Sequence, residues 1–69
     1  MSDSIYKVIE IIGTSKVSWE DAAKNAVERA SKTVRDLRVA EVVHQDIVID
    51  SGKVEAYRTK LSISFKYED

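Results

Sequence analysis

The C-terminal third of the chain alternates between two kinds of side chain, and no other feature constrains the fold as strongly. The mostly apolar or aromatic set is Tyr57, Thr59, Leu61, Ile63, Phe65 and Tyr67, and the polar or small set is Ala56, Arg58, Lys60, Ser62, Ser64 and Lys66. Successive side chains of a β-strand point to opposite faces, so a period of two predicts a strand that is buried on one face. Another part of the chain must therefore cover that face.

Residues 18–34 predict the amphipathic helix that provides this cover. Ser18 suits an N-cap, with Asp21 three positions later in an Asp variant of the capping box. Apolar residues then recur at spacings of three and four, which is typical of one buried helical stripe: Trp19, Ala22, Ala23, Ala26, Val27, Ala30 and Val34. We interpret Trp19, in the first turn, as a packing anchor rather than a platform for a ligand.

Two further strands complete the chain. Residues 5–12 are rich in β-branched side chains, and residues 13–15 predict a turn after them. Residues 39–49 predict a second strand, and Gly52 can take the left-handed conformation of the hairpin turn that follows. The whole chain, residues 1–69, is thus predicted to be one α+β domain with the element order β-α-β-β.

The connections predict the topology of the sheet. The helix returns the chain, so the second strand runs parallel to the first, whereas the hairpin makes the third strand antiparallel to the second. Placing the third strand between the other two gives a three-stranded antiparallel sheet in the order 1-3-2, wrapped on one helix. The core predicted from the two periodicities is Ile9, Ala23, Ala26, Val27, Ala30, Leu61, Ile63 and Phe65.

Such a core is thin, which makes self-association the expected source of stability. A chain near 60 residues buries only about 60% of its unfolded surface. The 69 residues include no cysteine and a single histidine, so neither a disulfide nor a zinc site of the usual ligands can reinforce the fold. We therefore predict an obligate homo-oligomer.

Charge and hydropathy argue against two classes of partner. The net charge of −1 and a pI near 5.8 give no general attraction for a phosphate backbone, which argues against nucleic acid. The apolar runs are too short to span a membrane. Residues 1–4 are polar and precede no basic or apolar segment of a secretory signal, so we expect a cytoplasmic protein.

No arrangement of residues predicts catalysis, and we expect no enzyme. The chain has no Gly-rich phosphate loop and no spacing that supports a Ser-His-acid set, and we interpret His44 as an ordinary strand residue. Asp46, Asp50 and Glu55 flank a turn but lack the spacing and the central glycine of an EF-hand. Carboxylates from different subunits could still form a calcium site.

Three neighbouring residues could bind a small ligand. Arg58 and Lys60 lie beside Tyr57, and two cations with an aromatic ring suit a phosphate or a flat ring system. Arg58 is the better candidate for a phosphate, because its guanidinium can engage two oxygens. The alternative interpretation is that both cations line a solvated or subunit-facing surface of the sheet.

Beyond these patterns, nearly the whole chain resembles the dodecin family. The resemblance is carried by residues 6–10, 13–15 and 18–20, then Ala22, Ala23, Ala26, Val27, Arg29, Ala30, Leu37 and Arg38, and finally residues 40–42 and 52–54, Tyr57 and Phe65. It implies β-α-β-β protomers that assemble into hollow homododecamers. It also implies binding of flavins such as riboflavin or FMN, stacked in pairs between indole rings and stored rather than used in chemistry.

The same resemblance places cofactor-binding residues at Val39, Gln45 and Arg58, and two of them depart from the family pattern. Val39 falls where the family has its flavin-stacking Trp, and Arg58 falls where it has a Gln that hydrogen-bonds the flavin ring. Valine has no aromatic face and arginine cannot accept a hydrogen bond, so free riboflavin is expected to bind weakly or not at all.

The pattern is closer to a dodecin subgroup that lacks the Trp and is linked to calcium. Some dodecins also resemble coenzyme A binders. Two functions therefore stay open at this point: a non-catalytic shell that holds flavin or coenzyme A, and a calcium-binding or purely structural assembly without flavin.

Overall fold

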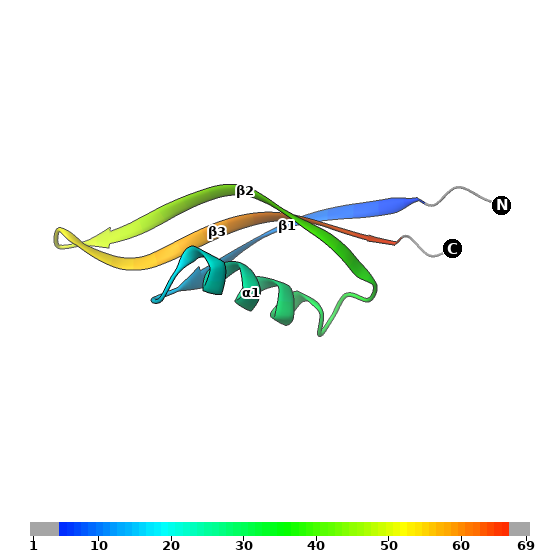
Figure 1. Cartoon of the computed structure of the whole chain (residues 1–69), viewed down its shortest axis with the longest axis horizontal. Coiled ribbons are helices and arrows are strands. Elements are labelled where there is room, and N and C mark those ends of the chain that lie inside the picture. Colours follow the sequence, from blue (N-terminus) through cyan, green and yellow to red (C-terminus); the bar gives the residue numbers. More distant parts are fainter. Residues whose placement is uncertain (1–4, 67–69) are drawn as a thin grey trace.

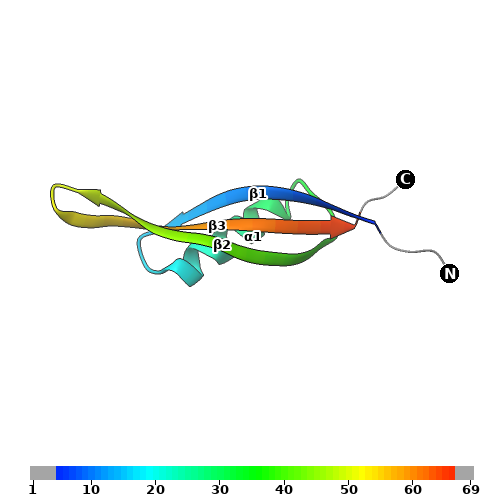
Figure 2. The same ribbon diagram turned by 90° about the horizontal axis from the view of Figure 1, so that it is seen from above.

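The computed structural model describes residues 5–66, which form three strands and one helix in the predicted order. The elements are β1 (Tyr6–Ser15), α1 (Trp19–Ala30), β2 (Leu37–Asp50) and β3 (Lys53–Lys66). The sheet has the order β1-β3-β2, and β3 pairs antiparallel with both neighbours, as predicted. Figure 1 shows α1 lying along one face of this sheet, and Figure 2 shows it from above.

The bounds of several elements differ from the prediction. Residues 13–15 were predicted to form a turn, but they continue β1, which ends at Ser15. The helix ends at Ala30, and the backbone N–H of Val34 donates to the Ala30 carbonyl in a following turn. Both hairpin strands are longer than predicted, while Tyr67 and residues 1–4 lie outside the described residues.

The core lies between the inner face of the sheet and α1. Its fully buried apolar residues are Ala22, Ala26, Leu61 and Ile63, and the residues packed partly against them are Ile9, Ile11, Ala23, Val27, Ala30 and Leu37. The predicted core is thus confirmed apart from Phe65, which is half-buried near the end of β3 and outside this cluster. The alternation places Thr59 on this face, but the predicted core did not include it. Thr59 is fully buried, and its hydroxyl donates to the Trp19 carbonyl at 2.9 Å.

A two-residue turn joins β2 to β3. Ser51 has φ 52° and Gly52 has φ 76°, while Asp50 pairs with Lys53. Positive φ at both central residues is the signature of a type I′ turn, which matches the twist of a hairpin. The left-handed Gly52 is confirmed, and Ser51 adopts the same region, which glycine or asparagine would occupy more easily.

Ser15 organises the connection from β1 to α1. Its hydroxyl donates to an Asp21 carboxylate oxygen at 2.6 Å and accepts from the backbone N–H of Val17 at 2.9 Å. The hydroxyl of Ser18 accepts from the Asp21 N–H at 3.0 Å, which confirms the predicted N-cap. The nearly buried Ser15 side chain therefore provides a hydrogen-bond partner for a backbone N–H of the turn. It also holds Asp21, the residue whose N–H is bonded by the N-cap Ser18.

We expect Ser15→Ala to lower the free energy of unfolding by roughly 1–3 kcal/mol, because it leaves partly buried polar groups of the turn unpaired. Chemical denaturation measures this loss. Ser62→Ala is the matched control: Ser62 is half-buried on the other face of the sheet, and its replacement should change stability by less than about 0.5 kcal/mol. Equal losses in the two variants would contradict the role assigned to Ser15.

Candidate functional site

The face of the sheet opposite α1 carries most of the ionisable strand residues. Residues paired directly across antiparallel strands share a face, so the register assigns them. This surface, termed the open face, comprises Tyr6, Val8, Glu10, Ile12 and Thr14 of β1, Val39, Glu41, His44, Asp46 and Val48 of β2, and Ala56, Arg58, Lys60, Ser62, Ser64 and Lys66 of β3. Its centre is polar and its two edge strands also present exposed aliphatic side chains.

The strongest electrostatic contact on the open face joins Arg58 to Asp46. The guanidinium donates through Nε and Nη2 to the two carboxylate oxygens, both at 2.7 Å. These hydrogen bonds hold the pKa of Asp46 below its ordinary value of 3.8, and the pKa of Arg58 is raised by the same pair. Both donor positions facing the carboxylate are therefore already used.

Lys60, the other cation of the predicted ligand-binding group, is also paired. Lys60 Nζ lies 3.4 Å from a Glu10 carboxylate oxygen on β1, and the residue opposite it on β2 is His44. Tyr57, by contrast, faces the helix side, where its ring meets Trp19 edge-on with centroids 5.1 Å apart. The predicted group of two cations and an aromatic ring is thus divided between the two faces, with each cation neutralised.

Trp19 serves as the packing anchor that the sequence predicts. Besides its contact with Tyr57, its indole Nε1 donates to the Asp46 carbonyl at 3.0 Å. The start of the helix is thereby attached to β2 at Asp46, the same residue whose carboxylate binds Arg58. No indole is left free to stack on a ligand at this position.

The structure does not bring the three predicted ligand-binding residues together within one chain, because Val39 lies far from Arg58 and Gln45 lies on the other face of the sheet. Val39 is 64% exposed and pairs with Ser64, six positions along β3 from Arg58, which corresponds to about 20 Å of strand. Gln45 pairs with Thr59 and therefore lies on the helix side of β2, although it is exposed. A site that uses all three residues would need contributions from more than one copy.

Sequence reasoning missed Asp46 as the partner of Arg58. A regular hairpin grown from the turn would set Asp46 opposite Tyr57, but an irregularity between Val48 and Ile49 shifts the register by one residue. That shift moves Arg58 opposite Asp46 and puts both side chains on the open face. The opposite charges of Asp46 and Arg58 were the only sequence signal for this pair. The position of the hairpin turn alone predicts a different register, in which the two residues are not opposite each other.

The described residues contain no ready-made cation site within one chain. Across residues 5–66, no group of three or more His, Cys, Asp or Glu side chains is arranged to hold a metal ion. In the same part of the chain, no helix combines the length and apolar character needed to cross a membrane.

We expect the Asp46 carboxyl to titrate with a midpoint below 3.8, measured by NMR of its side-chain carbon, and Arg58→Gln to move the midpoint up toward 3.8. The sign follows from the lowered pKa: the contribution of this pair to stability is present above pH 3.8 and is lost as the pH falls through the lower folded-state value. Lys60→Gln is the control and should leave the Asp46 midpoint unchanged, since Lys60 is paired with Glu10. If the titration midpoint of Asp46 is the same in the wild type and in Arg58→Gln, this assignment is wrong.

Comparison with known proteins identifies the family. The family model described as dodecin matches residues 5–68. This chain belongs to the dodecin family. Its fold agrees with the dodecin of Streptomyces coelicolor at a TM-score of 0.93, with 38% identity, over 100% of this chain and 99% of that one.

Two curated relatives belong to the same family, and the name of one of them includes calcium. Calcium dodecin of Mycobacterium tuberculosis is 57% identical over 91% of this chain and 89% of its own length. Its crystal structure, described as that of a calcium-chelating antigen with a novel calcium-binding site, matches at a TM-score of 0.83 over 94% of this chain and 93% of that one. The dodecin of Thermus thermophilus is 35% identical over 94% of both chains.

Proposed function

We propose that this dodecin is a non-enzymatic homododecamer that binds calcium between its copies and has lost ordinary flavin binding. The observation that carries the proposal is the Arg58–Asp46 pair together with Val39. The position expected to hydrogen-bond a flavin ring is a guanidinium that is paired with a carboxylate through two hydrogen bonds of 2.7 Å. The position expected to stack on the ring is an exposed aliphatic side chain.

Coenzyme A is less well supported than calcium. Its phosphates would need free cations, and Arg58 and Lys60 are each paired with an acid on the open face. Riboflavin and FMN would need an aromatic platform, and Val39 provides none. The 57% identity to calcium dodecin favours a divalent cation instead.

Calcium takes six to eight oxygen ligands, which one copy of this chain does not bring together. On the open face, Ser62 of β3 lies between Glu10 of β1 and Glu41 of β2, so a row of two carboxylates and a hydroxyl crosses the sheet. Glu41 is exposed and forms no ion pair with the described residues. We place this row in the site, with the remaining oxygens supplied by a neighbouring copy and by water.

The test is calorimetric titration of the assembled protein with Ca²⁺, Mg²⁺ and riboflavin, with the mass measured by light scattering. We expect a dodecamer that binds Ca²⁺ more tightly than Mg²⁺ and binds riboflavin at least about tenfold more weakly than Ca²⁺. Glu41→Gln should weaken Ca²⁺ binding at least about tenfold, whereas Glu20→Gln, at an exposed helix position, should not. Tight riboflavin binding without Ca²⁺ binding would overturn the proposal.

A further inference from the structure

Two ion pairs lie on the open face among residues 5–66, and they differ in how firmly they are held. Arg58 donates two hydrogen bonds of 2.7 Å to the two carboxylate oxygens of Asp46. Lys60 Nζ lies 3.4 Å from one carboxylate oxygen of Glu10, and the two side chains are 40% and 56% exposed. A single long contact between exposed charges is weak, whereas a bidentate pair is among the stronger ones. Lys60 therefore leaves Glu10 easily, while Arg58 stays on Asp46.

Glu10 belongs to the row of residues that we place in the calcium site. Ser62 of β3 pairs with Glu10 on β1 and with Glu41 on β2, so the two carboxylates flank one hydroxyl. Lys60 lies two positions from Ser62 on the same face of β3, which is roughly 7 Å along the strand. The ammonium of Lys60 therefore holds one of the two carboxylates that the row offers to a metal ion.

Within β3, no other cation lies as close to the row as Lys60 does. Arg58 and Lys66 are each four positions from Ser62. The nearest acid on the other side of Lys60 is Asp46, and Arg58 already neutralises it. A Lys60 side chain that leaves Glu10 therefore finds no unpaired carboxylate there, and its positive charge stays beside the row.

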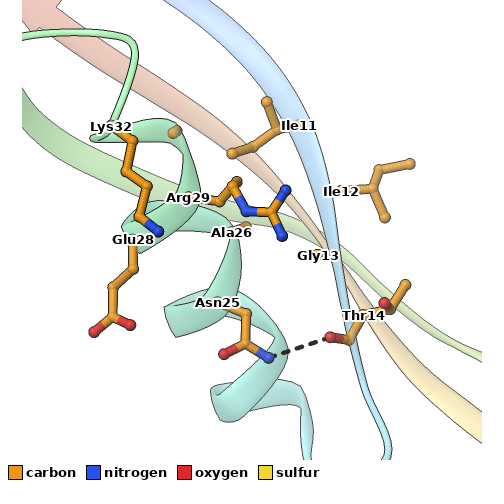
Figure 3. Close-up of a pocket in the computed structure, with 10 residues that line it drawn as sticks. Ile11, Ile12, Gly13, Thr14, Asn25, Ala26, Glu28, Arg29 and Lys32 are labelled. Atoms are coloured by element: carbon orange, nitrogen blue, oxygen red, sulfur yellow. Dashed lines mark hydrogen bonds between the residues drawn. The ribbon is translucent and has the colours of Figure 1, made fainter.

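The cations of the helix side are separated from the row by the sheet. Ile12 is the β1 residue that pairs with Lys60. In the groove between β1 and α1, Figure 3 shows the Ile12 side chain on the side of β1 away from α1, whereas Arg29 lies on the side toward the helix. The charges that decide how the row binds a cation are therefore Glu10, Glu41 and Lys60.

We propose that Lys60 is a built-in competitor for calcium, whose ammonium must leave Glu10 before the ion can be held there. The inference rests on the calcium site proposed above and adds what limits its affinity. Two carboxylates alone balance the two charges of Ca²⁺, but with Lys60 beside them the row carries only one net negative charge. Calcium affinity in proteins depends on the charge count of the site, so Lys60 keeps binding weak and readily reversible.

Replacing Lys60 tests this role in the assembled protein, by calorimetric titration with Ca²⁺ and Mg²⁺. Lys60→Gln should raise the Ca²⁺ affinity about fivefold to tenfold, because it removes one positive charge close to the row. The Mg²⁺ affinity should rise by a similar factor, since the effect depends on charge and not on ion size. All titrations use one fixed pH, because His44 also lies opposite Lys60.

Two further variants separate the contact with Glu10 from a general change of charge. Lys60→Arg keeps the charge and the competition, so its Ca²⁺ affinity should equal or fall below that of the wild type. Lys66→Gln removes the same charge from the same face of β3, but four positions from Ser62, and should change the affinity by less than about twofold. Light scattering checks that every variant assembles as the wild type does.

A crystal structure of the wild-type assembly grown with Ca²⁺ is a second measurement that needs no substitution. We expect a Glu10 carboxylate oxygen about 2.3–2.6 Å from the ion. Lys60 Nζ should then lie more than about 4 Å from Glu10, beyond the range of an ion pair. Calcium bound to Glu10 with the Lys60 contact unchanged would contradict the competition.

The outcomes distinguish the competitor from the site itself. If neither the wild type nor Lys60→Gln binds Ca²⁺, both proposals are wrong. If both bind it equally, or if Lys60→Arg gains as much affinity as Lys60→Gln, the competitor role alone is wrong. Calcium binding by Lys60→Gln but not by the wild type supports the competitor and overturns calcium binding by the natural chain.

Discussion

Gly13→Ala is expected to lower the free energy of unfolding by roughly 3 kcal/mol or more, or to prevent cooperative folding altogether. A methyl group at this position would run into the Ala22 carbonyl oxygen and would lie 2.8 Å from the Ala26 Cβ. The first obstacle is backbone, so no side-chain rotation can relieve it, and β1 and α1 would have to separate. Because this contact brings the helix onto the sheet, the whole core loosens with it.

Gly52→Ala is the matched control for this prediction. A Cβ on Gly52 meets nothing within 4 Å, but the residue has φ 76°. The expected loss is only about 1 kcal/mol, from placing a side chain in the left-handed region. Denaturation midpoints of the two variants and the wild type make the comparison. Similar midpoints for Gly13→Ala and the wild type would show that β1 and α1 do not approach as closely as described.

The double substitution Val39→Trp with Arg58→Gln is expected to raise riboflavin affinity about fivefold to a hundredfold. Stacking on the restored indole supplies roughly 1–3 kcal/mol. Glutamine adds a hydrogen-bond acceptor that a guanidinium lacks, and it also ends the pairing with Asp46. Quenching of riboflavin fluorescence during titration measures the change.

Val8→Trp with Arg58→Gln is the control for the position of the indole. Val8 and Val39 are 57% and 64% exposed, and both pair with Ser64 on the open face, one on β1 and the other on β2. A ring at Val8 should not raise the affinity, because the resemblance to flavin-binding dodecins places the stacking ring on β2. Submicromolar riboflavin binding by the wild type, unchanged in the Val39 variant, would contradict the assignment of the site.

The architecture followed from local patterns in the chain. The alternation around Leu61 and Ile63 and the stripe containing Ala26 are each set by the period of one element, and together they predicted a helix on one face of a sheet. The position of Gly52 predicted the turn for the same reason, since a left-handed residue is a local requirement. These features can be predicted without knowing which residues far apart in the sequence come into contact.

The contacts at the open face depended on the tertiary structure. Arg58 meets Asp46 only because the irregularity beside Ile49 moves the register by one residue, and a shift of one residue exchanges every neighbour across the strands. The sequence predicts Gly13 as a turn residue, yet it lies within β1, paired with Thr59, at the point where α1 approaches its backbone. The sequence by itself therefore determined the elements and their order, whereas pairing and packing between distant residues determined which charges are neutralised and which surfaces remain to be covered.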